Sequence, residues 1–200
     1  MIGVGTGTTS AIFVGELASR GPRVAAAVAS SRDTEGRLLA AGIRVVRLED
    51  AGRLSVYVDG ADEVGPDFEL LKGGGGAHTA EKRLAEASDL FVCIVDSSKP
   101  VLALGFRPVP VEVSTAELSR VERGLRAIGG VPRVREGFVT DGGGEVVDVS
   151  GLDISDQAAM ERRLESIPGV VACGIFSLRR ADVVIVGERG GSVSIRERTS

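Results

Sequence analysis

The sequence predicts an α/β fold: a doubly wound, mostly parallel, Rossmann-like sheet into which a small ferredoxin-like α+β domain is inserted. Three observations lead to this prediction. Short apolar runs alternate with segments of helical pattern, polar and glycine-rich residues follow the apolar runs, and the pattern changes near Pro108. Continuous apolar runs are typical of strands buried in a parallel sheet, and the alternation of strands with helices favours a doubly wound arrangement.

Five apolar runs are expected to form the large sheet, namely residues 1–5, 24–29, 55–58, 90–95 and 183–186. The helices expected between them are residues 10–20, 34–41 and 79–88. Gly42 follows the second helix as a stop, and Thr79 is placed to cap the third.

From Val109 onward the elements follow the order β-α-β-β-α-β, which is the order of a ferredoxin-like domain. Strands are expected at residues 109–113, 133–135 with 138–140, 145–149 and 170–176, and helices at 115–128 and 156–167. The predicted domains are therefore a Rossmann-like domain of residues 1–107 plus 180–200 and a small α+β domain of residues 108–179.

The composition is that of a globular protein, with 43% hydrophobic and 26% charged residues and a net charge of −4. The negative charge argues against nucleic acid or an anionic membrane as a partner, and the absence of Trp argues against stacking on bases. No apolar run is long enough to span a bilayer, and no signal peptide is recognised at the start, so a cytoplasmic location is expected. Cys93 and Cys173 lie in apolar runs and are expected to be buried thiols.

The first expected strand runs into a loop of glycine and threonine, residues 5–9, before a helix. Backbone N–H groups at a helix start, together with hydroxyl donors, form an anion-binding site. The loop has neither the lysine of a Walker motif nor the third glycine of a dinucleotide fingerprint. A small anionic ligand is therefore one interpretation, and an ordinary tight turn is the other.

Three carboxylates follow the third expected strand: Asp59, Asp62 and Glu63. They are open to three interpretations, which are a magnesium site, a solvated turn, and side chains that hydrogen-bond the hydroxyl groups of a sugar. The magnesium site is the weakest of these because no further ligands stand nearby and His78 is the only histidine.

Four consecutive glycines, residues 73–76, follow Lys72 and precede a helix that carries Glu81. Ordering four glycines costs much conformational entropy, which a folded protein tolerates where the backbone approaches something closely. The N–H groups of such a loop can surround a developing oxyanion, with Lys72 adding positive charge and Glu81 facing back toward the loop. The alternative is a flexible linker followed by a capping Glu. His78 is left without a role, and a solvated face is the interpretation of Arg120, Arg123, Arg126, Arg133 and Arg135.

Taken in order, these segments resemble the ribose-5-phosphate isomerase A family over almost the whole chain. Each single match is weak, whereas the ordered set is highly specific. The matching residues are 3–9, 59–63, 72–76 with Glu81 and Lys82, Asp96 with Ser98 and Lys99, 108–113, Thr140 and Asp141 with Asp148, 168–170 and 174–176.

The resemblance implies the interconversion of D-ribose 5-phosphate and D-ribulose 5-phosphate in the pentose phosphate pathway, through an enediolate and with no cofactor and no metal. Glu81 matches the family's general base, and Lys72 with the glycine N–H groups matches the site that stabilises the enediolate oxygens. Asp59 and Asp62 match residues that bind hydroxyls and assist ring opening. The family's substrate-binding positions correspond to Thr6, Gly7, Thr8, Thr9, Asp59, Gly60, Ala61, Asp62, Lys72, Gly73, Gly74, Gly75 and Lys99. A sugar phosphate is the implied ligand, and a homodimer or homotetramer is the implied assembly.

The sequence departs from the family's pattern at two places. Members usually begin with a helix whose lysine helps to hold the phosphate, whereas this sequence opens almost directly on Gly3. Unless the start is truncated, phosphate binding is expected to rest on the loop of residues 5–9 and on Lys99. Gly142 and Gly144 stand where the family tends to have Asn.

Two other classes of protein share the expected architecture. A sugar-phosphate sensor would need the anion-binding loop but has no use for a base such as Glu81. A coenzyme A transferase-like enzyme would use a nucleophilic Glu and would need a pocket for its carrier, for which the sequence gives no signal.

Overall fold

The structure is a computed structural model of the chain and describes residues 1–21 and 24–198. It separates into two compact units. The large-sheet unit comprises Met1–Ala61, Ala80–Lys99 and Ala181–Ser200, and the antiparallel unit comprises Asp62–Thr79 and Pro100–Arg180. The domain boundaries expected from the sequence, after residues 107 and 179, stay a prediction.

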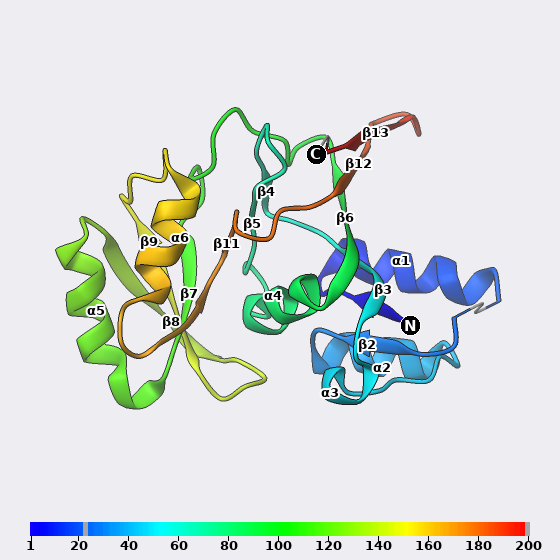
Figure 1. Cartoon of the computed structure of the whole chain (residues 1–200), viewed down its shortest axis with the longest axis horizontal. Coiled ribbons are helices and arrows are strands. Elements are labelled where there is room, and N and C mark those ends of the chain that lie inside the picture. The colour runs from blue at the N-terminus through cyan, green and yellow to red at the C-terminus, as the bar shows by residue number, and fades with distance from the viewer. Residues whose placement is uncertain (22–23, 199–200) are drawn as a thin grey trace. The chain divides into compact units, whose positions relative to one another are not determined.

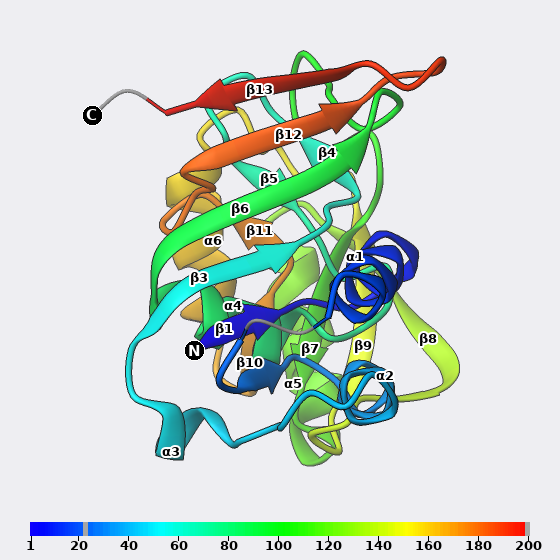
Figure 2. The ribbon, with the colours of Figure 1, turned by 90° about the vertical axis from the view of Figure 1, so that its right-hand side faces the viewer.

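The strands of the large-sheet unit form one six-stranded sheet in the order β13-β12-β6-β3-β1-β2 (Figure 2). Their bounds are β1 (Ile2–Val4), β2 (Ala27–Ala29), β3 (Leu54–Asp59), β6 (Ser88–Asp96), β12 (Val183–Gly187) and β13 (Val193–Glu197). Every neighbouring pair is parallel except β12 with β13. The predicted parallel sheet is therefore confirmed.

Helices cover both faces of this sheet, as a doubly wound fold requires. They are α1 (Thr8–Ser19), α2 (Arg32–Ala40), the single turn α3 (Leu48–Ala51) and α4 (His78–Glu86). On one face, Val4 of β1 shares an apolar core with Val14 of α1 and Leu38 of α2. On the other face, a Cβ atom on Gly3 would lie 3.3 Å from the Leu84 side chain, so α4 packs directly on the backbone of β1.

Two elements of this unit were missing from the sequence-based prediction. The strand β13 lies at the edge of the sheet and its residues are all exposed, so it lacks the apolar run by which a buried strand is recognised. The helix α3 is a single turn, which is too short to display helical periodicity.

The antiparallel unit contains a four-stranded sheet in the order β10-β7-β9-β8, together with two helices (Figure 1). The strands are β7 (Val109–Val113), β8 (Val131–Val139), β9 (Glu145–Ser150) and β10 (Val170–Cys173), and the helices are α5 (Leu118–Ala127), preceded by the 3-10 turn η1 (Thr115–Glu117), and α6 (Gln157–Glu165). Val121 and Leu125 of α5 and Leu164 of α6 share one apolar core with the sheet. The predicted ferredoxin-like order is confirmed, with residues 133–135 and 138–140 joined in one irregular strand.

A smaller sheet, β11-β5-β4, leads into the glycine loop. Its strands are β4 (Glu63–Val64), β5 (Leu70–Leu71) and β11 (Ile175–Phe176). The prediction of one strand over residues 170–176 is wrong, because the chain divides at Gly174 into β10 and β11. The Gly174 N–H donates to the Pro110 carbonyl at 2.7 Å, and the Gly174 carbonyl accepts from the Lys72 N–H at 2.9 Å. A side chain at Gly174 would overlap the Lys72 carbonyl, so only glycine permits this approach.

Cys93 and Cys173 are buried thiols, as the sequence predicts. Among the residues that the structure describes, no helix combines the length and the apolar composition that crossing a bilayer demands.

Candidate active site

The loop that follows β1 brings backbone N–H groups to the start of a helix. Gly7, with φ of +100°, is the N-cap of α1 and is exposed, as is Thr8 in the first turn. The loop begins beside β3, where the Gly5 N–H donates to the Val58 carbonyl at 2.9 Å. The first N–H groups of a helix have no partner within it and carry a partial positive charge. Such N–H groups can bind an anion, and the anion-binding role of this loop stays a prediction.

Asp59, at the end of β3, holds this loop in place through hydrogen bonds. Its Oδ1 accepts hydrogen bonds from the Thr6 N–H at 3.1 Å, the Ser10 hydroxyl at 3.1 Å and the Gly60 N–H at 2.7 Å. The Asp59 side chain is fully buried, and a Cβ atom on Gly5 would overlap its carboxylate. A side chain at position 5 would therefore disrupt the contact between the loop and the carboxylate, so this position requires glycine.

Tyr57 is a partner of Asp59 that the sequence did not reveal. Its hydroxyl donates to Asp59 Oδ2, and its ring is fully buried. Burial, followed by the negative charges of Asp59 and Glu81, raises the pKa of Tyr57 well above its ordinary value. The hydroxyl therefore remains a donor to Asp59.

A cluster of hydroxyl groups lies at the other side of the same loop. Thr6 Oγ1 lies 2.6 Å from Ser30 Oγ and donates to Ser31 Oγ at 2.8 Å. Thr34 Oγ1 donates to the Gly5 carbonyl at 2.8 Å, and Ser31 caps α2 by accepting from the Thr34 N–H. Ser30 and Ser31 directly follow β2. Thr34 was missed, although its place three residues after the capping Ser31 is a local signal.

Glu81 lies in the first turn of α4 and is 5% exposed. The start of this helix is fixed by Glu112 of β7, a buried carboxylate that accepts hydrogen bonds from the Thr79 hydroxyl and, at 2.6 Å, from the Thr140 hydroxyl. His78 is fully buried at the same helix start. The burial of Glu81 agrees with a functional carboxylate better than with a solvated helix cap.

The glycine loop itself, residues 72–76, belongs to the antiparallel unit. Gly73 and Gly76 have φ of +105° and +73°, conformations that favour glycine. A side chain at Gly73 would crowd Pro110, and one at Gly76 would overlap the ring of Phe138. Lys72 is 3% exposed, and its Nζ lies 5.6 Å from the ring centroid of Phe176. The loop is held by close packing, so the alternative of a flexible linker is wrong.

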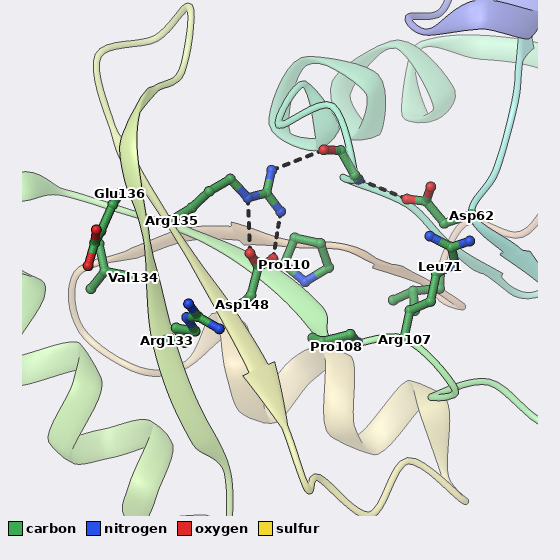
Figure 3. Close-up of a pocket in the computed structure, with 11 residues that line it drawn as sticks. Asp62, Leu71, Arg107, Pro108, Pro110, Arg133, Val134, Arg135, Glu136 and Asp148 are labelled. Atoms are coloured by element: carbon green, nitrogen blue, oxygen red, sulfur yellow. Dashed lines mark hydrogen bonds and ion pairs between the residues drawn. The ribbon is translucent and has the colours of Figure 1, made fainter.

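Polar side chains hold the exposed middle of the loop (Figure 3). The Gly74 N–H donates to Asp62 Oδ2 at 2.8 Å. Arg135 Nη1 donates to the carbonyls of Gly73 and Gly74, at 3.2 and 3.1 Å. The same guanidinium forms a two-point ion pair with Asp148, through Nε at 3.0 Å and Nη2 at 2.5 Å. A pocket of about 450 Å³ opens beside this network and is lined by Asp62, Gly74 and Arg135 among others.

Arg135 corrects one interpretation drawn from the sequence. Its side chain is 22% exposed and paired with Asp148, so it is not part of a solvated face. Arg120 and Arg126, by contrast, are more than half exposed on α5 and pair there with surface glutamates, as expected of such a face.

The three carboxylates at the end of β3 and just after it, Asp59, Asp62 and Glu63, lie in different units and have different partners. Asp59 lies in the large-sheet unit, whereas Asp62 and Glu63 lie in the antiparallel unit. Glu63 is buried and accepts hydrogen bonds from the N–H groups of Gly105 at 2.8 Å and Arg107 at 2.5 Å. Asp62 is partly buried and lines the pocket beside Gly74. Within residues 1–21 and 24–198, no group of three His, Cys, Asp or Glu side chains is arranged to hold a metal ion.

The predicted site residues are thus distributed over both units. The large-sheet unit contains Thr6, Gly7, Thr8, Thr9, Asp59, Gly60, Ala61, Glu81 and Lys99, and the antiparallel unit contains Asp62, Lys72, Gly73, Gly74 and Gly75. Lys99 is partly buried in a turn after β6, where its N–H donates to the Asp96 carbonyl at 3.1 Å. A hydrogen bond from Ser98 lowers the pKa of the exposed Asp96 in that turn.

Comparisons with known proteins agree on one family. The model of the family "Ribose 5-phosphate isomerase A (phosphoriboisomerase A)" matches residues 26–191. Ribose-5-phosphate isomerase A of Bordetella avium is 47% identical over 191 residues, which are 96% of this chain and 85% of the relative. The crystal structure of ribose 5 phosphate isomerase A from Neisseria gonorrhoeae superimposes with a TM-score of 0.96 at 42% identity, covering 100% of this chain and 89% of that chain.

A further solved structure, of a D-ribose-5-phosphate isomerase in complex with phospho-erythronic acid, has a TM-score of 0.92 at 36% identity and covers 98% of this chain and 90% of that chain. The family model, the similar sequences and the similar structures all identify the same family. The chain belongs to the ribose 5-phosphate isomerase A family.

Proposed function

We propose that the chain interconverts D-ribose 5-phosphate and D-ribulose 5-phosphate, as an aldose-ketose isomerase. The observation that carries this proposal, beside family membership, is the order of parts around the glycine loop: a held loop of glycines after the buried Lys72, followed at once by a helix whose first turn buries Glu81. Isomerisation next to a carbonyl requires these two parts, a base and a site for an oxyanion.

The reaction moves one proton between two adjacent carbons. Glu81 takes the proton from C2 of the open-chain aldose, which leaves an enediolate, and returns a proton to C1 to give the ketose. The oxygen on C1 gains a proton and the oxygen on C2 loses one, so no external oxidant or reductant enters. Because Glu81 is 5% exposed, bulk water has little access to the carboxylate and to the carbanion equivalent that it generates.

Lys72 and the N–H groups of Gly73 and Gly75 are proposed to stabilise the enediolate oxygens, while the Gly74 N–H, which donates to Asp62, is proposed to hold that aspartate beside the substrate. Charge develops on these oxygens only as the proton leaves, so donors fixed in advance lower the barrier without a cost of reorganisation. Proton transfer by a positioned base contributes about 10²–10⁴-fold, and the oxyanion site has to supply much of the remainder.

The phosphate is proposed to bind at the start of α1, to the loop of Thr6 to Thr9, with Lys99 as the cation that the family resemblance implies. Asp62, which lines a pocket and is only partly buried, is the better placed of the two aspartates to bind a sugar hydroxyl. Asp59 has both carboxylate oxygens engaged by protein donors, so its proposed contribution is to shape the phosphate loop as well as to assist ring opening.

The proposal extends to the setting of the enzyme. We place the reaction in the non-oxidative branch of the pentose phosphate pathway, in the cytoplasm, with the chain acting as a homodimer or homotetramer. The family resemblance supports these points, and light scattering of the purified chain tests the assembly.

One assay tests the reaction directly. The purified chain, treated with EDTA, is mixed with ribose 5-phosphate in deuterated water, and ribulose 5-phosphate and deuterium at the reacting carbon are followed by NMR. We expect turnover with solvent exchange. Binding of ribose 5-phosphate without turnover would instead identify a sugar-phosphate sensor, and loss of activity in EDTA that a divalent ion restores would reject the metal-independent mechanism.

A further inference from the structure

The carbonyl groups of the glycine loop are held by a side chain that the proposed mechanism does not use. We propose that Arg135, braced by Asp148, is a positioning residue that fixes the glycine loop in the geometry needed to stabilise the enediolate. This inference rests on the proposed isomerase function and adds to it a residue that acts through the glycine loop.

The donors of Arg135 are divided between two tasks (Figure 3). Nε and Nη2 bind the two oxygens of Asp148, at 3.0 and 2.5 Å, and this pairing fixes the plane of the guanidinium. Nη1 then bridges the carbonyls of Gly73 and Gly74, at 3.2 and 3.1 Å. Arg135 and Asp148 stand on the neighbouring strands β8 and β9, so the support comes from a sheet and not from another loop.

Fixing a carbonyl also fixes the N–H group on the other side of the same peptide plane. The peptide between Gly73 and Gly74 is held at both ends, because Arg135 binds its carbonyl and Asp62 accepts from its N–H at 2.8 Å. The peptide between Gly74 and Gly75 has its carbonyl on Arg135, so the Gly75 N–H points away from the guanidinium. Arg135 therefore sets the direction of an N–H group in the exposed middle of the loop.

A second contact ties Arg135 to the same loop. Its guanidinium carbon lies 5.4 Å from the centroid of the Phe138 ring, and that ring occupies the space in which a side chain of Gly76 would stand. The strand β8 thus supports the loop at Gly73, Gly74 and Gly76. Glycines have the most backbone freedom to lose, so a catalytic loop built from them needs such external restraint.

The expected consequence is a loss of rate with little loss of substrate binding. A displacement of about 1 Å in a catalytic group can lower the rate by about 10²-fold. We therefore expect Arg135→Ala to lower kcat by about 10- to 100-fold and to change KM by less than about threefold. Because a guanidinium ion fits the vacated space, added guanidinium should restore part of kcat at concentrations well below those that unfold the protein.

Arg120→Ala is the matched control. Arg120 lies on α5 of the same antiparallel unit, and its exposed side chain pairs with Glu117 of the neighbouring turn. Its kcat should stay within about twofold of the wild type. Asp148→Ala should lower kcat in the same direction as Arg135→Ala, and the double variant should fall no further than Arg135→Ala alone, because both changes release one clamp.

The experiment measures kcat, KM, guanidinium rescue and amide hydrogen exchange of the glycine loop in these variants beside the wild type. Faster exchange in the loop of Arg135→Ala than of Arg120→Ala, together with the selective loss of kcat and its rescue, supports the clamp. An unchanged kcat, a rise confined to KM, or unchanged loop exchange in Arg135→Ala overturns it. If the wild-type chain does not isomerise ribose 5-phosphate, the proposed function is wrong, and the role of Arg135 in it falls as well. If the wild type is active and Arg135→Ala is equally active, only the inference about Arg135 is wrong.

Discussion

Replacing Tyr57 by Phe would remove a single hydroxyl from the interior of the large-sheet unit. The ring, which stacks on Phe91 with centroids 4.9 Å apart, stays in place, whereas the hydrogen bond to the fully buried Asp59 is lost. Loss of a hydrogen bond to a charged acceptor costs about 1.5–3 kcal/mol. Each kcal/mol shifts the unfolding midpoint of a chain of this size by about 2–4 °C, so the midpoint should fall by roughly 3–12 °C.

The same hydroxyl makes the stability of the wild-type chain depend on alkaline pH. Burial, then the charges of Asp59 and Glu81, raise the pKa of Tyr57 well above its ordinary value of 10.0. Below that value the contribution to stability is fully present. Above it the unfolded chain releases the proton and the folded chain retains it, so each further pH unit costs about 1.4 kcal/mol until the raised folded-state pKa is reached. The difference between wild type and Tyr57→Phe isolates this effect from the titration of lysines.

The composition provides a direct assay, because the chain has one Tyr and no Trp. The ultraviolet absorbance of tyrosinate therefore reports on Tyr57 alone. In the folded chain this signal should appear only as the protein unfolds, whereas in urea it should appear near the ordinary pKa. Tyrosinate forming near the ordinary value in a chain that is still folded would refute the argument from burial. Equal midpoints for the two proteins at neutral pH would refute the energy assigned to the hydrogen bond.

Three further outcomes test the site and its support. Glu81→Gln keeps the size of the side chain but cannot accept a proton. We expect kcat to fall by about 10² or more with KM changed little, and proton exchange at the reacting carbon to stop. Near-normal turnover of this variant would mean that Asp59 or Asp62 is the base. Ribose without its phosphate should react with a far lower kcat/KM than ribose 5-phosphate, and comparable values would remove the anion role from the loop at the start of α1. Gly144→Ala should lower the free energy of unfolding, measured in urea, by about 1–3 kcal/mol, because its Cβ atom would lie 2.7 Å from the Glu112 side chain. In the control Gly142→Ala the Cβ atom would lie 3.4 Å from the same side chain, so its free energy of unfolding should stay within about 0.5 kcal/mol of the wild type.

The sequence was informative where burial and periodicity coincide. Strands such as β3 and β6 are buried and apolar enough to be recognised, and the glycines that end helices marked their boundaries. The two-residue strands β4 and β5 are too short to show any period, and β13 consists of exposed residues only. These strands form by pairing with residues that are distant along the chain, so no local sequence pattern predicts them.

The same limit applies to the site. The sequence singles out motif residues such as Lys72, Gly74 and Glu81 because they stand close together along the chain. The contacts that hold these loops come from far along the chain and were not foreseen: Arg135 binds Gly73 across 62 positions, and Asp59, itself a candidate site residue, accepts from Thr6 across 53. Arg135 in particular looks like any solvated arginine in a strand that also carries Arg133, until the structure places Asp148 opposite it.

The break at Gly174 has a consequence for the order in which the protein is made. On the ribosome, β5 emerges early and ends at Leu71, next to Lys72, yet its neighbour β11 and the Gly174 backbone that binds Lys72 follow much later. A nascent chain that stops before this point has the glycine loop but lacks the strand that pins its lysine. The loop therefore takes its final form only late in synthesis, and truncated translation products should bear an unfinished glycine loop however well their first strands have folded.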